Sequence, residues 1–313
     1  MKAGSDFWGK VAFYASKTPM FGTDYMKHQY LRLVRPGRNG QKKNHDDALN
    51  RWLLPDRLSA LEWCRERNAK GVKGVFGIEG SYSRDASQAM RATRAYISAA
   101  TMIAEKGLKG SLSVKLSTIG VAFDRQLCRR NLRRICEAGT RRKVGVEMDM
   151  EGKSLVDFYI QSAVESTAEE CPVTLALQAY LDRTPEDLDR VLDNGIRVRL
   201  VKGAYVGDTD DFKEIQRRLK SLAMRLSATG LPFSVGTHDP EIIYWARTEL
   251  AGKKGSLEFG FLKGMSDETK IGLVRDDWAV AEYVPLGRQG DAYISRRLRY
   301  LRMLERIGRS PAP

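Results

Sequence analysis

The chain has 313 residues, of which 42% are hydrophobic and 29% are charged, and its formal net charge is +14. This hydrophobic fraction supports a sizeable core and excludes a chain that is disordered throughout. No apolar run reaches the roughly 18 to 20 residues that cross a bilayer, and the N-terminus lacks the apolar segment of a secretory signal, so we expect a cytoplasmic protein.

Residues 1–65 have a helical and loop-like pattern. They contain the breaker cluster RPGRNG at 35–40 and a helix that starts at a proline after Leu54. No Gly, Ser or Pro-rich linker divides the chain. We therefore expect a helical segment at 1–65 packed on one barrel domain at 66–310.

Short β-branched runs alternate with longer helical segments from this point on. The helical pattern at 184–195 opens with Thr184 and Asp187, which resemble a capping box, and closes at Gly195. The β-rich runs are VKGVFGIE at 72–79, SLSVKLST at 111–118, VGVEMDME at 144–151, VTLALQAY at 173–180, IRVRLVKG at 196–203, PFSVGTHD at 232–239, SLEFGFL at 256–262 and VAEYVPLG at 280–287.

Eight such alternations in one domain predict a parallel sheet closed into an α/β barrel of the (βα)8, TIM-like type. A doubly wound open sheet is the alternative. That fold would be favoured by a glycine-rich phosphate turn after the first strand, whereas GIEGSYS at 77–83 contains no GxGxxG.

Polar side chains stand where most of these runs end. The carboxyl ends of barrel strands share one face, where the functional groups of such barrels gather. Repetition of this pattern over the strands indicates a common site, formed by Glu79, Lys115, Asp149, Gln178, Arg199, Lys202, Thr237, His238, Glu258 and Tyr283.

Arg199 lies among aliphatic residues within its run. A buried guanidinium without acceptors costs several kcal/mol, on the order of a lost ion pair. Its candidate partners are Asp149, Glu258 and an anionic ligand, and an internal salt bridge with no ligand is the structural alternative.

Tyr293, Arg296 and Arg297 lie on one face of the last predicted helix, because they are spaced i, i+3 and i+4. Two neighbouring guanidinium groups repel unless an anion lies between them, and a small carboxylate would satisfy both. The alternative is a basic outer face, which is the interpretation we give to Arg299 and Arg302.

The cysteines and the excess of basic residues point to no metal or nucleic acid. Cys64, Cys128, Cys136 and Cys171 form no CxxC pair or metal-like spacing, so we expect buried free thiols and no metal site. The basic segments at 32–44 and 296–309 are not interleaved with aromatic residues. A solvated basic surface is therefore expected rather than a nucleic-acid partner.

Together, several motifs resemble the proline dehydrogenase family, which comprises FAD-dependent (βα)8 barrels that oxidise L-proline to 1-pyrroline-5-carboxylate. The resemblance runs from about Phe76 to Leu298, and its motifs occur in family order. They are KLS at 115–117, DME at 149–151, LQAY at 177–180, RLVKGAY at 199–205, GTHD at 236–239, LEF at 257–259, and YVPLG followed by Tyr293 and RRL, within 283–298.

The resemblance implies a role for each matching residue. Lys115, Arg296 and Arg297 would bind the substrate carboxylate, Tyr283 and Tyr293 would wall the proline ring, and Glu79 would pair with the arginines. The implied catalytic residues are Lys115, Asp149, Arg199, Tyr283, Tyr293, Arg296 and Arg297. The implied FAD-binding residues are Asp149, Gln178, Arg199, Val201, Lys202, Gly203, Ala204, Tyr205, Thr237, His238 and Glu258.

The resemblance further implies hydride transfer from proline to the flavin, with Arg199 near flavin N5. It implies a membrane quinone as the electron acceptor. A basic C-terminal helix could reach acidic lipids at the inner membrane face, although a partly exposed barrel helix is the commoner meaning of this pattern. No motif specifies an oligomeric state.

Four positions depart from the family pattern: Val206, Gly260, Gly290 and Tyr300 replace the aromatic, glutamine, tryptophan and glutamate that are usual there. We expect the smaller residues at the rim, Val206 and Gly290, to enlarge or open the pocket. The alternatives are therefore a dehydrogenase of a proline analogue or another cyclic or secondary amino acid, and a catalytically silent barrel with a binding role.

Overall fold

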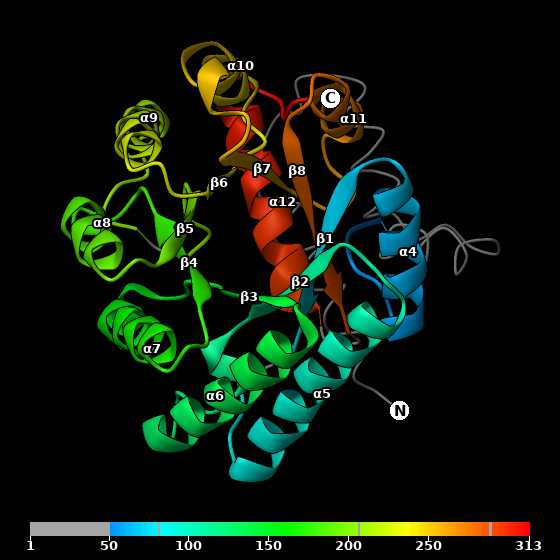
Figure 1. Ribbon diagram of the computed structural model, residues 1–313. Helices are drawn as coiled ribbons and strands as arrows, with labels where there is room; N and C mark the ends of the chain where they lie inside the picture. Colours follow the sequence, from blue (N-terminus) through cyan, green and yellow to red (C-terminus); the bar gives the residue numbers. More distant parts are fainter. Residues whose placement is uncertain (1–50, 81, 206, 288–289) are drawn as a thin grey trace, which may run out of the picture.

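The computed structural model describes residues 51–80, 82–205, 207–287 and 290–313. Eight parallel strands form a closed barrel in chain order (Figure 1). Because β1 pairs with β8, from Val72 opposite Val280 to Ile78 opposite Leu286, the open sheet is excluded and the predicted barrel is confirmed. The strands are β1 Val72–Ile78, β2 Gly110–Val114, β3 Gly145–Met148, β4 Val173–Gln178, β5 Arg197–Val201, β6 Phe233–Gly236, β7 Leu257–Leu262 and β8 Ala279–Leu286.

Helices follow the strands and cover the outside of the barrel. Several begin at an aspartate whose carboxylate accepts a hydrogen bond from a backbone N–H of the first turn, as Asp56, Asp85 and Asp124 do. The helices are α4 Arg57–Ala69, α5 Ala86–Glu105, α6 Arg125–Arg142, α7 Val156–Ala168, α8 Thr184–Asp193, α9 Phe212–Ala228, α10 Pro240–Glu249, α11 Asp267–Arg275 and α12 Asp291–Arg306.

One predicted helix start was wrong. Thr184 is the first residue of α8 and does not cap it, because its hydroxyl donates to the Gln178 carbonyl at 2.5 Å instead. The boundary expected at residue 65 falls inside α4. Residues 1–50, which make up most of the expected N-terminal segment, lie outside the described residues.

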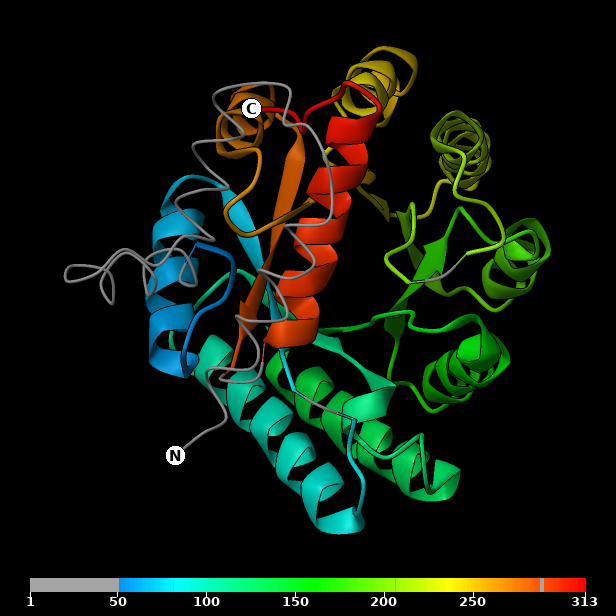
Figure 2. The ribbon, with the colours of Figure 1, turned by 180° about the vertical axis from the view of Figure 1, so that it is seen from behind.

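The first described helix, α4, and the last, α12, occupy different positions: one packs outside the barrel and the other covers its end. α4 packs on the outside of β1, where the missing side chain of Gly74 leaves room for Cys64. In both views α12 lies inside the ring of outer helices (Figure 2). Its residues Tyr293 and Ile294 pack with Val75 and Tyr283 of the strands, so α12 covers one end of the barrel.

The hydrophobic core lies between the strands and the outer helices, and the inside of the barrel is largely polar. Cys64, Cys128, Cys136 and Cys171 are buried and free, as predicted. Over the described ranges, no helix is both long enough and apolar enough to span a bilayer.

A buried ion pair joins α4, α11 and β8. The Lys270 ammonium contacts the Glu282 carboxylate, and both side chains are 0% exposed. Glu282 also accepts a hydrogen bond from Trp63 and lies 3.7 Å from Arg67 Nε. A single outward-facing carboxylate of β8 therefore anchors α4 in the place of the eighth outer helix.

Replacing Glu282 tests this anchor. Glu282→Gln leaves the buried Lys270 ammonium with Asp267, 2.9 Å away, as its remaining described carboxylate partner. We therefore expect a loss of about 3 kcal/mol in the free energy of unfolding, the lower end of the range for a broken buried ion pair. Urea denaturation measures this loss. The double variant Lys270→Met with Glu282→Leu buries no unpaired charge and should lose less than the single variant; an equal or larger loss would contradict the anchoring role of the pair.

Candidate active site

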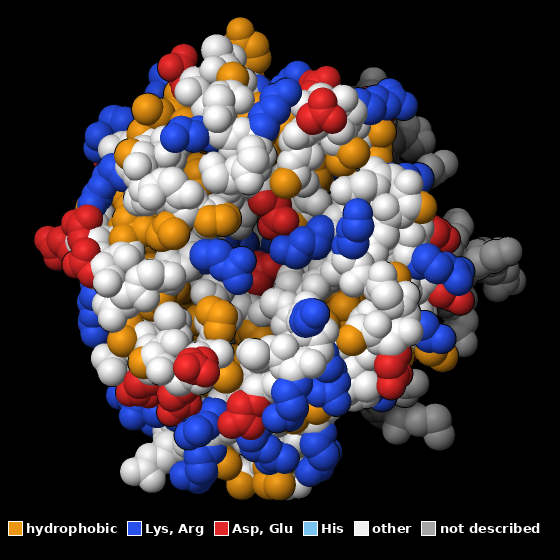
Figure 3. Space-filling model, in the orientation of Figure 1, with side chains coloured by type: hydrophobic (Ala, Val, Ile, Leu, Met, Phe, Trp, Pro, Cys, Tyr) orange, Lys and Arg blue, Asp and Glu red, His pale blue; other side chains and the backbone are white. Residues whose placement is uncertain are grey.

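A cavity of about 1150 Å³ occupies the barrel beneath α12. It is larger than the roughly 300–1,000 Å³ of most small-molecule pockets. Strand residues such as Val75 and Arg199 line it together with residues of α9 and α12. On the face in Figure 3, Lys and Arg side chains are spread among Asp and Glu, and a hollow bordered by both signs opens over the middle of the strand ring.

Ion pairs run through the inside of the barrel in alternating order. We call the set the axial charge chain; it consists of Glu258, Lys73, Glu147, Arg199, Asp149, Lys115 and Glu79. Within the strands it uses β1, β3, β5 and β7, which are alternate strands of the barrel. Side chains of alternate strands share layers inside such barrels, which explains how residues far apart in sequence meet there.

The lower half of the axial charge chain consists of Glu258, Lys73 and Glu147, which lie within β7, β1 and β3. Lys73 Nζ lies 3.3 Å from Glu258 Oε2 and 3.5 Å from Glu147 Oε1. Glu147 Oε2 lies 3.1 Å from Arg199 Nη1, and its other oxygen accepts a hydrogen bond from Ser111 at 2.6 Å. Glu147 is 5% exposed, so its ionised form depends on these partners.

The upper half of the axial charge chain runs from Arg199 to Glu79. Arg199 Nη2 contacts Asp149 Oδ1, and the other Asp149 oxygen lies 3.3 Å from Lys115 Nζ. Lys115 also donates to Glu79 at 2.8 Å and to the Tyr283 hydroxyl at 2.5 Å. Tyr283 in turn donates to Glu79 at 2.6 Å. All donors of the Lys115 ammonium are therefore directed at protein groups.

The charges fix the ionisation of the central residues. Burial would raise the pKa of Asp149, but Arg199 and Lys115 outweigh it and lower that pKa to about 2. Burial likewise opposes ionisation of Glu147, and the charges of Arg199 and Lys73 hold its pKa below the ordinary value. The pKa of Lys115 is well above its ordinary value because Glu79, Tyr283 and Asp149 outweigh its burial.

Arg296 and Arg297 have no carboxylate partner within 4.0 Å among the residues described. Arg296 lies over the Tyr205 ring at 5.1 Å, and Arg297 lies over the Tyr293 ring at 4.8 Å. The Nε of Arg297 and the hydroxyl of Tyr293 are buried without a hydrogen-bond partner in this part of the structure. Buried donors of this kind are nearly always hydrogen-bonded in folded proteins, so a bound ligand or a water molecule would satisfy them.

Tyr283 and Tyr293 stack beside these arginines, with ring centroids 6.1 Å apart. The ring of Tyr283 lies over β1 because Gly77 has no side chain there; a Cβ at that position would lie 2.0 Å from the Tyr283 hydroxyl. The stacked phenols, the arginine pair and the upper end of the axial charge chain therefore meet at the same end of the cavity.

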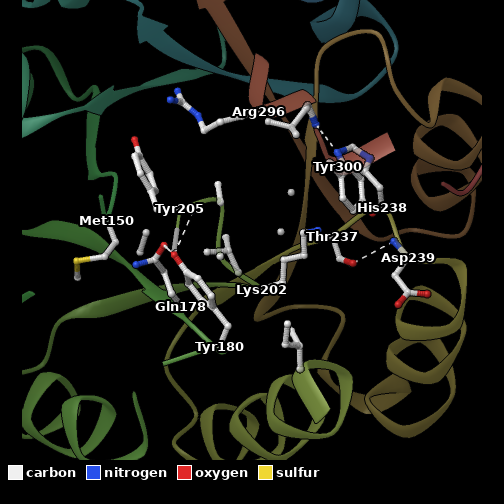
Figure 4. A pocket seen from close by; sticks show the side chains of 18 of the residues that line it. Met150, Gln178, Tyr180, Lys202, Tyr205, Thr237, His238, Asp239, Arg296 and Tyr300 are labelled. Carbon is white, nitrogen blue, oxygen red and sulfur yellow. Dashed lines mark hydrogen bonds between the residues drawn. The ribbon is translucent and has the colours of Figure 1, made fainter. Parts of the chain in front are cut away.

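A second group of residues surrounds another part of the cavity. Figure 4 shows Tyr205, Lys202 and Thr237 around one open space. The Tyr180 hydroxyl donates to Gln178 at 2.9 Å and accepts from the Tyr205 backbone N–H at 3.1 Å. Its ring occupies the position that a Cβ of Gly203 would take, and Gly203 has φ +119°, so the β5–α9 loop requires glycine there.

Burial lowers the pKa values of Lys202 and His238. Lys202 Nζ lies 3.5 Å from the centre of the Tyr300 ring, and burial together with the charge of Arg297 lowers its pKa to about 7. His238 Nε2 accepts from the Leu262 N–H at 3.2 Å, so its Nδ1 carries the proton and faces Ser266 at 3.0 Å. Burial lowers the pKa of His238 well below its ordinary value, so the ring is neutral and offers a ligand only its faces.

The structure brings most of the predicted residues to one cavity: Lys115, Asp149, Gln178, Arg199, Val201, Lys202, Gly203, Ala204, Tyr205, Thr237, His238, Glu258, Tyr283, Tyr293, Arg296 and Arg297. Their individual roles stay predictions. Glu147 and Tyr180 also line it, and our sequence analysis missed both. Glu147 has a sequence signal, because it stands two residues before Asp149 and so points to the same side of β3.

Several placements expected from sequence were wrong. Glu258 is the second residue of β7 and lies near its beginning, where it pairs with Lys73. Glu79 pairs with Lys115 instead of the arginines. Arg199 pairs with Asp149, one of its expected candidate partners, but its second carboxylate is Glu147 and not Glu258.

The structure describes the surroundings of two of the positions that depart from the family pattern, Gly290 and Gly260. A Cβ at Gly290 would lie 2.2 Å from Leu53, so a neighbouring side chain fills the space that we expected to be open. Arg299 and Arg302, expected on an outer face, line the cavity. Gly260 lies beside Gly236 in the cavity wall, and Val206 lies outside the described residues.

The low pKa of Asp149 predicts a pH-dependent contribution to stability. Because the folded pKa of about 2 lies below the unfolded value of about 3.9, this contribution is present above about pH 4 and is lost as the pH falls toward 2. We expect Asp149→Asn to cost about 2 kcal/mol at pH 7, and the difference from the parent chain to shrink below pH 4. Urea denaturation at several pH values measures it, and a difference that does not change with pH would contradict the assignment.

Comparisons with known proteins agree with this architecture. A family model described as proline dehydrogenase matches residues 60–221. Proline dehydrogenase 2 of Bacillus subtilis is 26% identical over 77% of this chain and 82% of its own length. Proline dehydrogenase 1 of the same organism is 28% identical over 77% of this chain and 82% of its own length. The proline dehydrogenase of Deinococcus radiodurans is 26% identical over 79% of this chain and 86% of its own length.

Two solved structures share the fold. Proline utilization A of Bdellovibrio bacteriovorus, inactivated by N-propargylglycine, superposes with a TM-score of 0.74 at 20% identity over 82% of this chain. Proline utilization A of Bradyrhizobium japonicum superposes with a TM-score of 0.70 at 20% identity over 91% of this chain. The chain spans 33% and 34% of the length of these two proteins.

Proposed function

Since the chain belongs to the proline dehydrogenase family, whose members are oxidoreductases acting on the CH–NH group of proline, we propose that it oxidises L-proline to 1-pyrroline-5-carboxylate with FAD as the hydride acceptor. The observation that carries the proposal is the arginine pair of α12. Arg296 and Arg297 face the cavity beside two stacked tyrosines, without a protein carboxylate in the described residues to neutralise them.

The residues present suit FAD. The cavity is larger than a free amino acid needs, and Lys202 lines it without a described carboxylate within 4.0 Å. Because its pKa is lowered to about 7, an anionic group bound beside it would favour its charged form. When bound, FAD supplies a ring that accepts a hydride. The residues that would hold it are Gln178, Arg199, Val201, Lys202, Gly203, Ala204, Tyr205, Thr237 and His238.

We assign the substrate carboxylate to Arg296 and Arg297. Guanidinium groups bind carboxylates through paired hydrogen bonds, and Arg297 Nε is a buried donor without a described partner. Lys115, which the resemblance also assigned to the carboxylate, is occupied by Glu79, Tyr283 and Asp149. Its role is therefore to hold the Tyr283 hydroxyl, so that the phenol ring forms a fixed wall for the proline ring.

This chain's residues contribute placement and charge. The clamp on the carboxylate fixes which carbon–hydrogen bond of the substrate faces the cofactor, which reduces the entropic part of the barrier. Tyr283 and Tyr293 exclude water from the same end of the cavity because both rings are buried. Asp149 stays ionised and keeps Arg199 and Lys115 charged beside the reacting groups.

A proline analogue is the second candidate substrate, and one observation favours it. Gly236 and Gly260 lie side by side in the cavity wall, and neither carries a side chain. Val201 closes the space beside Gly236, but position 260 lacks the glutamine that is usual in the family, so a cyclic or secondary amino acid larger than proline would gain room beside Gly260.

An anaerobic flavin-reduction screen tests the proposed reaction. The purified protein should take up FAD and lose the oxidised-flavin absorbance when L-proline is added without oxygen. Hydroxyproline, pipecolate and an acyclic secondary amine serve as comparisons. Faster reduction by one of these would favour the second candidate, whereas a flavin that no amino acid reduces would contradict both.

Replacing either arginine tests the carboxylate clamp. Arg296→Met or Arg297→Met removes a charged hydrogen-bond donor, so KM for proline should rise about 10–100-fold while FAD stays bound. Steady-state kinetics and the flavin spectrum measure the two effects. Arg130→Met, an exposed arginine of α6, is the matched control. A KM equal to that of the control would contradict the assignment.

A further inference from the structure

The lower half of the axial charge chain has no part in the proposed chemistry. Lys73 and Glu258 are the second residues of β1 and β7, and Glu147 is the third of the four residues of β3. Their ion pairs nevertheless continue without interruption to Arg199. Arg199 lines the cavity and is among the residues that would hold the flavin.

Glu147 controls the guanidinium group of Arg199 in two ways. It binds Nη1 at 3.1 Å while Asp149, the residue directly after β3, binds Nη2, so the two carboxylates together fix the plane of the group. The Nε of Arg199 is then buried without a described partner. Glu147 also supplies a negative charge that partly cancels the positive charge that Arg199 presents to the cavity.

Lys73 acts on the same charge with the opposite sign. It lies 3.5 Å from Glu147 and 3.3 Å from Glu258, and it makes no described contact with Arg199. A positive charge at Lys73 offsets part of the negative charge of Glu147. The electric potential at Arg199 therefore depends on both residues: the negative charge of Glu147 makes it more negative, and the positive charge of Lys73 makes it more positive.

We propose that Glu147 and Lys73 are positioning residues that set the orientation and effective charge of Arg199, and through it the reduction potential of the flavin in this cavity. The inference rests on the proposed function, because it needs a bound flavin. Neither residue touches the substrate or the cofactor in this account. The reduced flavin ring carries more negative charge than the oxidised ring, so a more positive Arg199 environment favours reduction.

Two substitutions should shift the potential in opposite directions. Glu147→Gln removes a negative charge beside Arg199 and should raise the potential, whereas Lys73→Met leaves Glu147 more negative and should lower it. We expect each to change the ratio of reduced to oxidised flavin, at a fixed ambient potential, on the order of tenfold, which is about 30 mV for a two-electron couple.

Equilibrium titration of the FAD-bound variants against a redox dye measures these shifts. Glu147→Asp keeps the charge and should return the potential toward that of the parent chain. Glu258→Gln removes the other carboxylate paired with Lys73 and should raise the potential by less than Glu147→Gln does. It replaces Glu147→Gln in the test if Glu147→Gln does not fold. Glu165→Gln, which removes a carboxylate paired with Arg129 on the outer helices, should leave the potential unchanged.

The outcomes separate this inference from the proposed function. Opposite shifts for Glu147→Gln and Lys73→Met support the inference, because a purely structural disturbance would not reverse sign between neighbouring residues. Shifts in the same direction, or none, in protein that binds FAD and oxidises proline would overturn it while leaving the proposed function intact. A parent chain that binds no flavin would overturn the proposed function, and the inference with it.

Discussion

The alternation of charge along the barrel axis is the constraint on which the site depends. Several ionised groups can be buried in one barrel only if each lies against a group of opposite sign, because an isolated buried charge costs several kcal/mol, about as much as the protein's whole margin of stability. The ion pairs from Glu258 to Glu79 meet this condition. They hold Arg199, Asp149 and Lys115 charged at the floor of the cavity.

The helices at the two ends of the described chain complete this arrangement. α4 takes the place of the eighth outer helix through the Glu282 anchor, which leaves α12 available to lie across the barrel end. α12 brings Arg296 and Arg297 over the floor that the axial charge chain has already neutralised. Two guanidinium groups without a described carboxylate partner thus lie where a small acid is proposed to bind.

The alternation of β-rich and helical runs was sufficient to predict the barrel, because it is a local signal. The polar strand ends, together with the resemblance to the family, predicted most of the cavity lining. The sequence was insufficient for partners across the barrel. Whether Glu79 reaches Lys115 or the arginines depends on the stagger of the strands, and Glu258 was misplaced because the run SLEFGFL does not reveal where its strand begins. The contact of Gly290 with Leu53 joins segments more than two hundred residues apart, and no periodicity encodes it.

The most direct test of the account is a crystal structure of the FAD-bound protein with a five-membered cyclic carboxylate that cannot be oxidised. The account predicts that the carboxylate lies within hydrogen-bonding distance of both Arg296 and Arg297, while Arg199 remains between Glu147 and Asp149. A carboxylate bound away from the arginine pair, or an Arg199 side chain turned out of the axial charge chain, would contradict it.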